Sequence, residues 1–292
     1  MDVVFRILSD FRFRLINRSR LWKRQQSGNG IVLVLIVIGS IGFHIFSPWW
    51  WTPIASNWSV IDDMISVTFW ITGFVFAAVI LFMAYCVFGF RRGKRRLAAY
   101  QSENNKLELW LTGLTSLSAA ALLAPGLMVW FKFVTVPEGT DEVEVFAQQW
   151  SWSYRLPEKD GKLGTADNRL ISCDNPLGIT LGDPNGQDDV VIKADDLHLA
   201  LGRPVKMLLR SVDVLHDYWV SEFRAKLDMV SVMSTYFWLE PTRIGTFDIL
   251  CADLCSTGHG ALRGMVMIDP EDDYQTWLFE QETFAQLTRQ KR

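Results

Sequence analysis

Apolar residues gather in three long runs within the first 136 positions and fall into short stretches after them. The runs predict membrane-spanning helices over 31–47, 64–90 and 109–135, because a helix of about 20 apolar residues crosses the hydrocarbon core of a bilayer. The first run is the shortest, yet the tryptophan triplet at 49–51 follows it as an interfacial belt does. We therefore interpret residues 31–136 as a transmembrane anchor.

The charges that flank these runs predict an orientation. Residues 1–30 are basic, 91–96 reads RRGKRR, and 47–63 contains neither Lys nor Arg. Because positive charge stays on the cytoplasmic side, we expect the N-terminus and the 91–108 loop inside the cell and the second half of the chain outside. A cleaved signal peptide is the alternative for the first run. The long basic segment and the lack of a small-residue cleavage site disfavour it.

Beyond Pro137 the pattern changes to short stretches that are rich in strand-forming residues. Turn signals separate these stretches, which is typical of an all-β sandwich or barrel. The predicted strands are 143–150, 197–201, 205–211, 235–240, 246–251 and 265–268. We expect one β domain over 137–270.

Two further segments flank this pattern. Residues 157–189 are rich in Gly, Asp, Asn and Pro and predict a long loop. Its part 183–189 offers oxygen ligands for calcium but lacks the full calcium-loop pattern, so a solvated turn is favoured. Residues 271–292 carry an apolar stripe at helical spacing that Gln281 interrupts. This stripe predicts a C-terminal helix with an imperfect face.

Charge is divided unevenly between the two halves. Residues 1–136 hold 14 Lys and Arg against 6 Asp and Glu, and residues 137–292 hold 15 against 26. The basic front half fits the membrane topology, so nucleic-acid binding is not needed to explain it. An acidic outer domain favours a basic partner.

The chain has only four Cys and four His, and three of these eight residues lie within nine positions. Cys251, Cys255 and His259 follow a predicted strand at intervals of four, and His216 lies near the end of a neighbouring one. Thiolates suit Cu(I), zinc or iron–sulfur. No second zinc-binding pair is obvious, the haem attachment motif is absent, and the chain cannot easily supply the four cysteines of an iron–sulfur cluster. Copper is therefore favoured. A disulfide between the two cysteines, or two buried cysteines with a surface His, are the alternatives.

Several motifs occur in a family-specific order over about residues 60 to 290. "QQWSWSY" (148–154), "DVLH" (213–216), "KLD" (226–228), "CADLC" (251–255) and "GH" (258–259) follow one another. In these motifs the chain resembles subunit II of the haem–copper cytochrome c oxidases. The resemblance implies transmembrane helices followed by a cupredoxin-like β-sandwich or barrel that carries a dinuclear copper A centre.

The resemblance also implies a ligand set. Cys251 and Cys255 would bridge a pair of copper ions, and His216 and His259 would each cap one ion. The backbone carbonyl of Asp253 would complete the set, where the family usually has Glu. The side chain at that position helps to bind a magnesium ion shared with subunit I, which makes magnesium a second expected cofactor.

The resemblance assigns roles to two further residues. Trp150 matches the surface tryptophan through which electrons enter from cytochrome c, with a core aromatic as the alternative. Glu108 lies where the family has a carboxylate at the mouth of a proton path into subunit I. Trp110 is displaced by one position relative to that motif, and an interfacial carboxylate near a helix N-terminus is the alternative for Glu108.

Two positions depart from the family pattern. The family's last ligand is a Met three residues after the second His, where this chain has Leu262, and Ser256 replaces a usual Gly. Leucine cannot ligate copper, but a weak axial ligand tunes the redox potential more than it holds the metal. We expect the centre to survive with a raised potential and a less symmetric electron distribution.

Taken as a whole, the resemblance predicts the subunit at which electrons enter a haem–copper terminal oxidase. A c-type cytochrome would donate electrons to the copper pair, which would pass them to haem in subunit I for oxygen reduction. The chain would be a multi-pass protein of a bacterial-type inner membrane that contacts subunit I and other oxidase subunits, with its C-terminal domain on the periplasmic side. The alternatives are the same role in a nitric oxide reductase, or a metal-free subunit of the quinol-oxidase or scaffold type.

Overall fold

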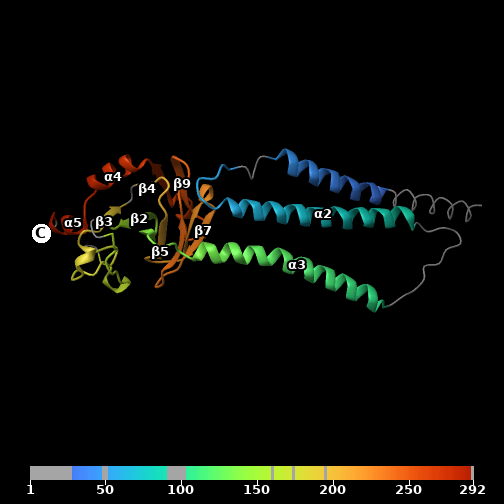
Figure 1. Ribbon diagram of the computed structural model, residues 1–292, viewed down its shortest axis with the longest axis horizontal. Coiled ribbons are helices and arrows are strands. Elements are labelled where there is room, and N and C mark those ends of the chain that lie inside the picture. The colour runs from blue at the N-terminus through green and yellow to red at the C-terminus, as the bar shows by residue number, and fades with distance from the viewer. Residues whose placement is uncertain are drawn as a thin grey trace, which may run out of the picture. The chain divides into compact units, whose positions relative to one another are not determined.

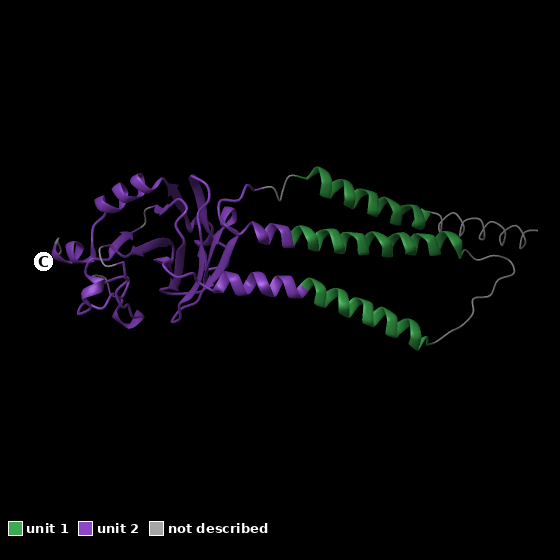
Figure 2. Ribbon diagram, viewed as in Figure 1, with its two compact units in different colours: residues 1–51, 65–122 green, residues 52–64, 123–292 purple. Residues whose placement is uncertain are grey.

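The computed structural model describes residues 28–47, 52–90, 103–158, 161–172, 175–193 and 196–290. Most of the basic segment 1–30, the tryptophan triplet and the RRGKRR run lie outside these ranges. The chain divides into two compact units (Figure 2). Unit 1 comprises Met1–Trp51 and Ile65–Leu122, and unit 2 comprises Thr52–Met64 and Leu123–Arg292.

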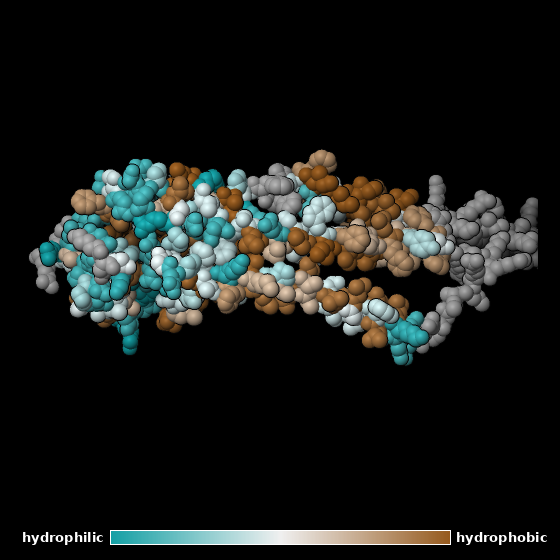
Figure 3. Space-filling view, in the orientation of Figure 1, coloured by the Kyte–Doolittle hydropathy of each residue, from teal (hydrophilic) through white to brown (hydrophobic). Residues whose placement is uncertain are grey.

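Within the described residues, three helices are long and apolar enough to cross a membrane: Gly28–Phe46, α2 (Ser59–Gly89) and α3 (Asn105–Val134). Most of their apolar side chains are exposed, and they colour these helices brown in Figure 3. α2 begins five residues and α3 four residues before its predicted start. The reason is that polar residues begin a helix before its apolar run. At the start of α3, for example, the side chain of Asn104 accepts a hydrogen bond from the Leu107 N–H at 3.1 Å.

The rest of the described chain forms a β-sandwich of two five-stranded sheets (Figure 1). Their strand orders are β3-β2-β1-β5-β8 and β4-β10-β9-β6-β7. The strands are β1 (Asp141–Gln148), β2 (Ser151–Leu156), β3 (Val190–Lys193), β4 (Leu197–Ala200), β5 (Val205–Ser211), β6 (His216–Val220), β7 (Ala225–Met229), β8 (Thr235–Leu239), β9 (Gly245–Cys251) and β10 (Arg263–Asp269). The predicted class, membrane-type helices followed by an all-β domain, is confirmed.

The inward faces of both sheets share one hydrophobic core. Tyr154, Tyr218 and Phe237 are fully buried in it, and the rings of Tyr218 and Phe237 join the two sheets at 6.0 Å. Burying side chains of this size contributes about 1.5–3 kcal/mol each. The same cluster contains Cys251 and Cys255, so the loop that carries the candidate ligands is built on the best-packed part of the domain.

The start of α2 and the end of α3 belong to unit 2 and pack against β8. The indole N–H of Trp58 donates to the Trp238 carbonyl at 2.9 Å, and that of Trp238 donates to the Lys132 carbonyl at 2.8 Å. Phe133 stacks on Phe237 with ring centroids 5.5 Å apart. These contacts extend the core of the β domain into the ends of both helices.

The 157–189 segment covers part of the first sheet instead of projecting into solvent. It contains η1 (Asn168–Leu170) and η2 (Pro184–Gly186). Its Leu177 and Ile179 form a second small core with three residues from elsewhere in the chain, which are Phe146, Val191 and Phe284. The predicted long loop is therefore a packed element.

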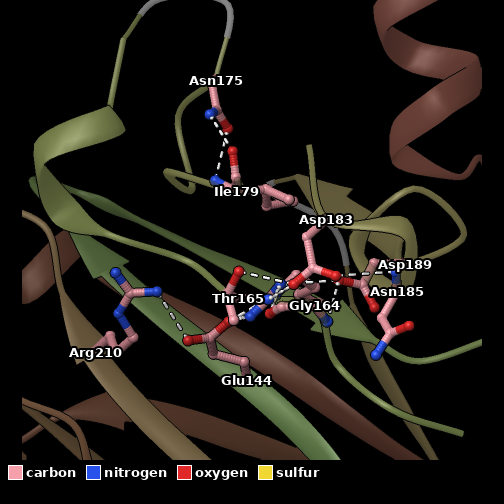
Figure 4. A network of polar contacts seen from close by, with 10 residues as sticks. Glu144, Gly164, Thr165, Asn175, Ile179, Asp183, Asn185, Asp189 and Arg210 are labelled. Carbon is pink, nitrogen blue, oxygen red and sulfur yellow. Dashed lines mark hydrogen bonds and ion pairs between the residues drawn. The ribbon is translucent and has the colours of Figure 1, made fainter. Parts of the chain in front are cut away.

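A buried ionic network ties this segment to the sheet (Figure 4). Arg155 donates to Glu144 at 2.7 Å and to Asp189 at 2.8 Å, and Arg210 donates to Glu144 at 2.9 Å. All four side chains are less than a tenth exposed. Burial is the main cause that raises the pKa of Asp189 to about 6, and the Arg155 guanidinium opposes it.

The first carboxylate of the acidic turn at 183–189 accepts hydrogen bonds from residues of the same 157–189 segment. Asp183 accepts hydrogen bonds from the N–H and hydroxyl of Thr165, both at 2.7 Å, and from the Asn185 N–H at 3.1 Å. These bonds, those from Thr165 first, lower the pKa of Asp183. They support the solvated-turn interpretation over a calcium loop.

The C-terminal segment is two helices, so the prediction of a single helix over 271–292 is wrong. α4 (Glu271–Glu280) ends where Gln281 turns to extended backbone, and α5 (Phe284–Gln290) begins after a three-residue break. In the break, Thr283 forms a bridge with Val190 of β3. The Phe284 side chain then enters the second core. Tertiary contacts to the sheet therefore outweigh helix continuity here.

Removing the arginine at the centre of the buried network should strongly destabilise the fold. Arg155→Met leaves the buried Asp189 without its Arg155 partner and leaves Glu144 paired with Arg210 alone, and we expect a loss of about 3–5 kcal/mol. Thermal unfolding of the detergent-solubilised chain measures it. Arg169→Met is the matched control, because Arg169 is 89% exposed and pairs with Asp167 at the surface. Equal stability of both variants would contradict this account of the network.

Candidate metal centre

The two cysteines and His259 converge in the loop after β9. Cys251 closes the strand, Cys255 follows in the loop, and His259 opens η4 (His259–Ala261). The two sulfurs are 3.8 Å apart, and the Cys255 sulfur is 3.6 Å from the His259 Nδ1. A disulfide requires about 2.05 Å between sulfurs. Both thiols are free, so the disulfide alternative is wrong for this structure.

His216 reaches the same place from the neighbouring strand. β6 pairs with β9 so that Tyr218 lies opposite Cys251, which brings the first residue of β6 beside the loop. The His216 ring is fully buried, and its Nδ1 is 4.0 Å from the Cys251 sulfur. The ligand atoms of His216, Cys251 and Cys255 all lie within 4.8 Å of one another.

A carboxylate orients the buried imidazole. Asp213 Oδ1 is 2.8 Å from the His216 Nε2, so an N–H on Nε2 leaves Nδ1 free to face the thiols, in the way that metal-binding histidines are usually held. Burial tends to raise the pKa of Asp213, but hydrogen bonds from His216, Val214 and Gln149 outweigh it and lower that pKa. Asp213 therefore stays ionised as a hydrogen-bond acceptor.

The Cys255 thiol is protonated while no metal is bound. Burial, followed by the hydrogen bond and charge of the neighbouring Cys251, raises the pKa of Cys255 to about 11. The Asp253 carbonyl oxygen lies 3.2 Å from the Cys251 sulfur. A metal that binds here must displace the thiol protons, so binding becomes tighter as pH rises.

The donor set fits copper. Sulfurs, imidazole nitrogens and a backbone carbonyl oxygen surround one small volume, and this mixture of soft and borderline ligands is typical of copper sites. The side chains of His216, Cys251 and Cys255 are buried, so a metal held by them would be shielded from water.

A second group of possible ligands lies beside the first. Asp217, Asp228 and Asp253 place carboxylate oxygens within 4.8 Å of one another. Asp217 is fully buried, and among the described residues neither of its carboxylate oxygens has a hydrogen-bond partner, although the Lys226 Nζ lies 3.7 Å from Oδ2. Burial, then the nearby Asp228, raises the pKa of Asp217 to about 7. Only Asp253 of these three belongs to the set predicted from the sequence.

Trp150 lies in the turn between β1 and β2 and is 42% exposed. It is therefore not a core aromatic, unlike Trp152, which is 2% exposed. A Cβ built on Gly258 would come within 2.3 Å of the Trp150 indole. The indole thus lies against the loop that carries the candidate ligands.

Glu108 belongs to the other compact unit. Glu108 lies in the first turn of α3, within unit 1, and the ligand residues belong to unit 2. Leu262, in contrast to Glu108, belongs to the same unit as the candidate ligands. It is 2% exposed and packs in the same core cluster as Cys251 and Cys255.

Ser256 occupies a backbone conformation that favours glycine. Its φ is 102°, in a region that non-glycine residues avoid. Ser256→Gly should therefore stabilise the metal-free chain by about 1 kcal/mol. The unfolding midpoint measures it, with Thr257→Gly as the control that gains nothing because Thr257 has no positive φ. A lower midpoint for Ser256→Gly would contradict the strain argument.

Sequence reasoning alone quotes Asp213, Gln149 and Gly258 within its motifs but assigns them no role at the site. Asp213 had a usable signal, because an Asp three residues before a metal-binding His can orient its ring. Gln149 and Gly258 carry no such signal, since their contacts join segments 106 and 108 positions apart.

Comparison with known proteins agrees with the fold. The family "Cytochrome C oxidase subunit II, periplasmic domain" matches residues 142–268. The "Alternative cytochrome c oxidase subunit 2" of Bradyrhizobium diazoefficiens is 62% identical over 258 residues, covering 88% of this chain and 93% of that protein. "Cytochrome c oxidase subunit 2" of Cereibacter sphaeroides is 26% identical and covers 72% of this chain and 74% of its own length.

Among solved structures, the periplasmic domain of subunit II of cytochrome oxidase from Bradyrhizobium japonicum matches half of this chain and 95% of its own length. The TM-score is 0.37 and the identity 18%. The assignment rests on the long match at 62% identity. The chain belongs to the cytochrome c oxidase subunit 2 family, a component of an oxidoreductase complex.

Proposed function

We propose that this chain is the subunit at which electrons enter a haem–copper terminal oxidase. The observation that carries the proposal is the convergence of two free thiols and two imidazoles on one small volume at the end of β9. The names of the relatives favour oxygen, rather than nitric oxide, as the final acceptor.

We assign the bound metal as a dinuclear copper A centre. Cys251, Cys255, His216, His259 and the Asp253 carbonyl would hold the copper ions. When bound, the centre accepts and passes on one electron at a time. The protein contributes by fixing His216 through Asp213 and by burying the ligands, which limits rearrangement between oxidation states.

Trp150 is the proposed point of contact with the electron donor. It is exposed on one side and lies against Gly258 on the other, so it can contact both a docked protein and the ligand loop. The donor is a c-type cytochrome with a basic docking face, because the second half of the chain holds 26 Asp and Glu against 15 Lys and Arg.

Electrostatic docking makes a direct prediction. Raising the ionic strength from 10 mM to 150 mM shortens the Debye length from about 30 Å to about 8 Å. We therefore expect the second-order rate of copper reduction by a reduced basic c-type cytochrome to fall by about tenfold or more. Stopped-flow mixing with the copper-loaded full chain measures it. A rate that does not change with salt would overturn the docking proposal.

Magnesium is the second proposed cofactor, with the Asp253 side chain as a ligand shared with subunit I. The proximity of Asp217 and Asp228 to Asp253 supports it, since carboxylate oxygens suit this ion. Manganese added to the purified complex is the probe. Loss of its bound resonance signal in Asp253→Asn supports the assignment, and an unchanged signal contradicts it.

The remaining assignments concern the membrane part. We propose a multi-pass protein of the bacterial inner membrane with its β domain in the periplasm, in contact with subunit I and other oxidase subunits. Glu108 stands at the cytoplasmic mouth of a proton path into subunit I. If Glu108→Gln leaves both turnover and proton pumping of the complex intact, that role is excluded.

A further inference from the structure

The turn between β1 and β2 is bonded to both loops that carry the candidate ligands. The backbone N–H of Gln149 donates to Asp213 Oδ2 at 2.7 Å, and Asp213 holds the His216 ring through its other oxygen. The side-chain amide of Gln149 donates to the Cys255 carbonyl at 2.9 Å. A single residue therefore connects this turn to the His216 loop and to the cysteine loop.

The neighbouring Gln148 makes no comparable link. Its side-chain amide donates to the Ser151 hydroxyl at 2.9 Å, inside the same hairpin. The two glutamines thus have the same chemistry at adjacent positions. Only Gln149 uses it to hold the hairpin against the ligand loops.

Close packing adds a third contact to the two hydrogen bonds. A Cβ on Gly258 would lie 2.3, 2.5 and 2.8 Å from three indole carbons of Trp150, and no real Cβ tolerates such distances. Gly258 immediately precedes His259, whose Nδ1 is 3.6 Å from the Cys255 sulfur. The missing side chain at Gly258 is what lets the indole reach the backbone beside this ligand.

Gly260, the glycine on the other side of His259, has room for a side chain. A Cβ on Gly260 would meet nothing within 4 Å. Gly258 and Gly260 therefore form a matched pair on either side of His259, and only the first lies under the indole.

We propose that Gln149 and Gly258 are positioning residues that hold the Trp150 indole against the ligand loop and so set the rate at which the copper centre accepts an electron. The proposal rests on the proposed function, because it requires the copper pair and an external donor. In the step concerned, the haem iron of a reduced c-type cytochrome is oxidised by one electron and the copper pair is reduced by one. No bond forms or breaks, and no proton is transferred.

The decisive variant is Gly258→Ala in the copper-loaded full chain in detergent. At saturating reduced c-type cytochrome, we expect the limiting rate of copper reduction to fall by about tenfold or more, because displacements near 1 Å at a reacting contact have effects of this size or larger. Copper content, the resonance spectrum and the rate of reduction by ascorbate should stay as in the wild type. Gly260→Ala should match the wild type in every measurement.

Gln149→Leu removes the hydrogen bond from the Gln149 side chain to the Cys255 carbonyl without adding bulk under the indole. It should slow reduction by the cytochrome in the same direction as Gly258→Ala, and Gln148→Leu should leave this rate unchanged. Because ascorbate is small and needs no docked contact at Trp150, its rate separates positioning from damage to the centre.

Each outcome decides one of the two claims. A wild-type chain without a dinuclear copper signal overturns the proposed function itself. A normal copper signal together with unchanged cytochrome rates in Gly258→Ala and Gln149→Leu overturns only the positioning role. Equal slowing by cytochrome and ascorbate, or loss of copper in these variants, also overturns it, because the residues would then maintain the metal site instead of the contact with Trp150.

Discussion

Cys251→Ser should abolish the dinuclear centre. The Cys251 sulfur is the most connected atom of the site, since it lies 3.8 Å from the Cys255 sulfur, 4.0 Å from the His216 Nδ1 and 3.2 Å from the Asp253 carbonyl oxygen. A hydroxyl is a hard and weak ligand for copper, so it cannot replace a bridging thiolate. We expect copper content to fall from about two ions per chain to one or none, and reduction by the cytochrome to be lost with it.

Cys86→Ser is the matched control. Cys86 is also a free cysteine, but it lies in α2, away from the ligand loop in sequence and in the other compact unit. Copper content measured by elemental analysis should be unchanged in this variant. If Cys251→Ser retained the copper and spectrum of the wild type, the ligand assignment would be wrong.

Leu262→Met should lower the reduction potential of the centre. Leu262 is buried in the cluster that contains both cysteines, and it occupies the position of the family's weak thioether ligand. A Leu-to-Met change conserves volume and costs less than about 1.5 kcal/mol. A restored thioether stabilises the oxidised centre, so we expect a decrease of at least about 60 mV, a tenfold change in a one-electron equilibrium.

A reductive titration followed by the optical bands of the copper centre measures this shift. Leu262→Ile changes the packing without adding a ligand, and it should keep the potential of the wild type. The methionine variant should also show a more even distribution of the unpaired electron. Equal potentials in Leu262→Met and the wild type would show that this position does not tune the centre.

The sequence predicts best those strands whose burial does not depend on a distant charged partner. β5 occupies the predicted residues 205–211, and β8 and β9 differ from their predicted ranges by one residue. β2 was missed because it contains Arg155, whose burial depends on Asp189, 34 positions away. β7 is not among the predicted strands, although its five residues alternate between apolar and polar in the way that a half-buried strand does.

The candidate site shows the same division between local and long-range information. The spacing of Cys251, Cys255 and His259 within one loop was visible in the sequence, and the structure brings His216 to them through the pairing of β6 with β9. Gln149 could not be selected in this way. Its partners are 64 and 106 positions away, and nothing in its local sequence distinguishes it from Gln148.

The central claim is that the four side-chain ligands hold a pair of copper ions that share one electron. Electron paramagnetic resonance of the copper-loaded full chain in detergent, with total copper assayed on the same sample, tests it most directly. The account predicts hyperfine splitting from one electron shared between two copper nuclei, even though Leu262 replaces the usual thioether ligand. Splitting from a single nucleus, or a chain that retains no copper, would contradict it and would favour a metal-free scaffold subunit.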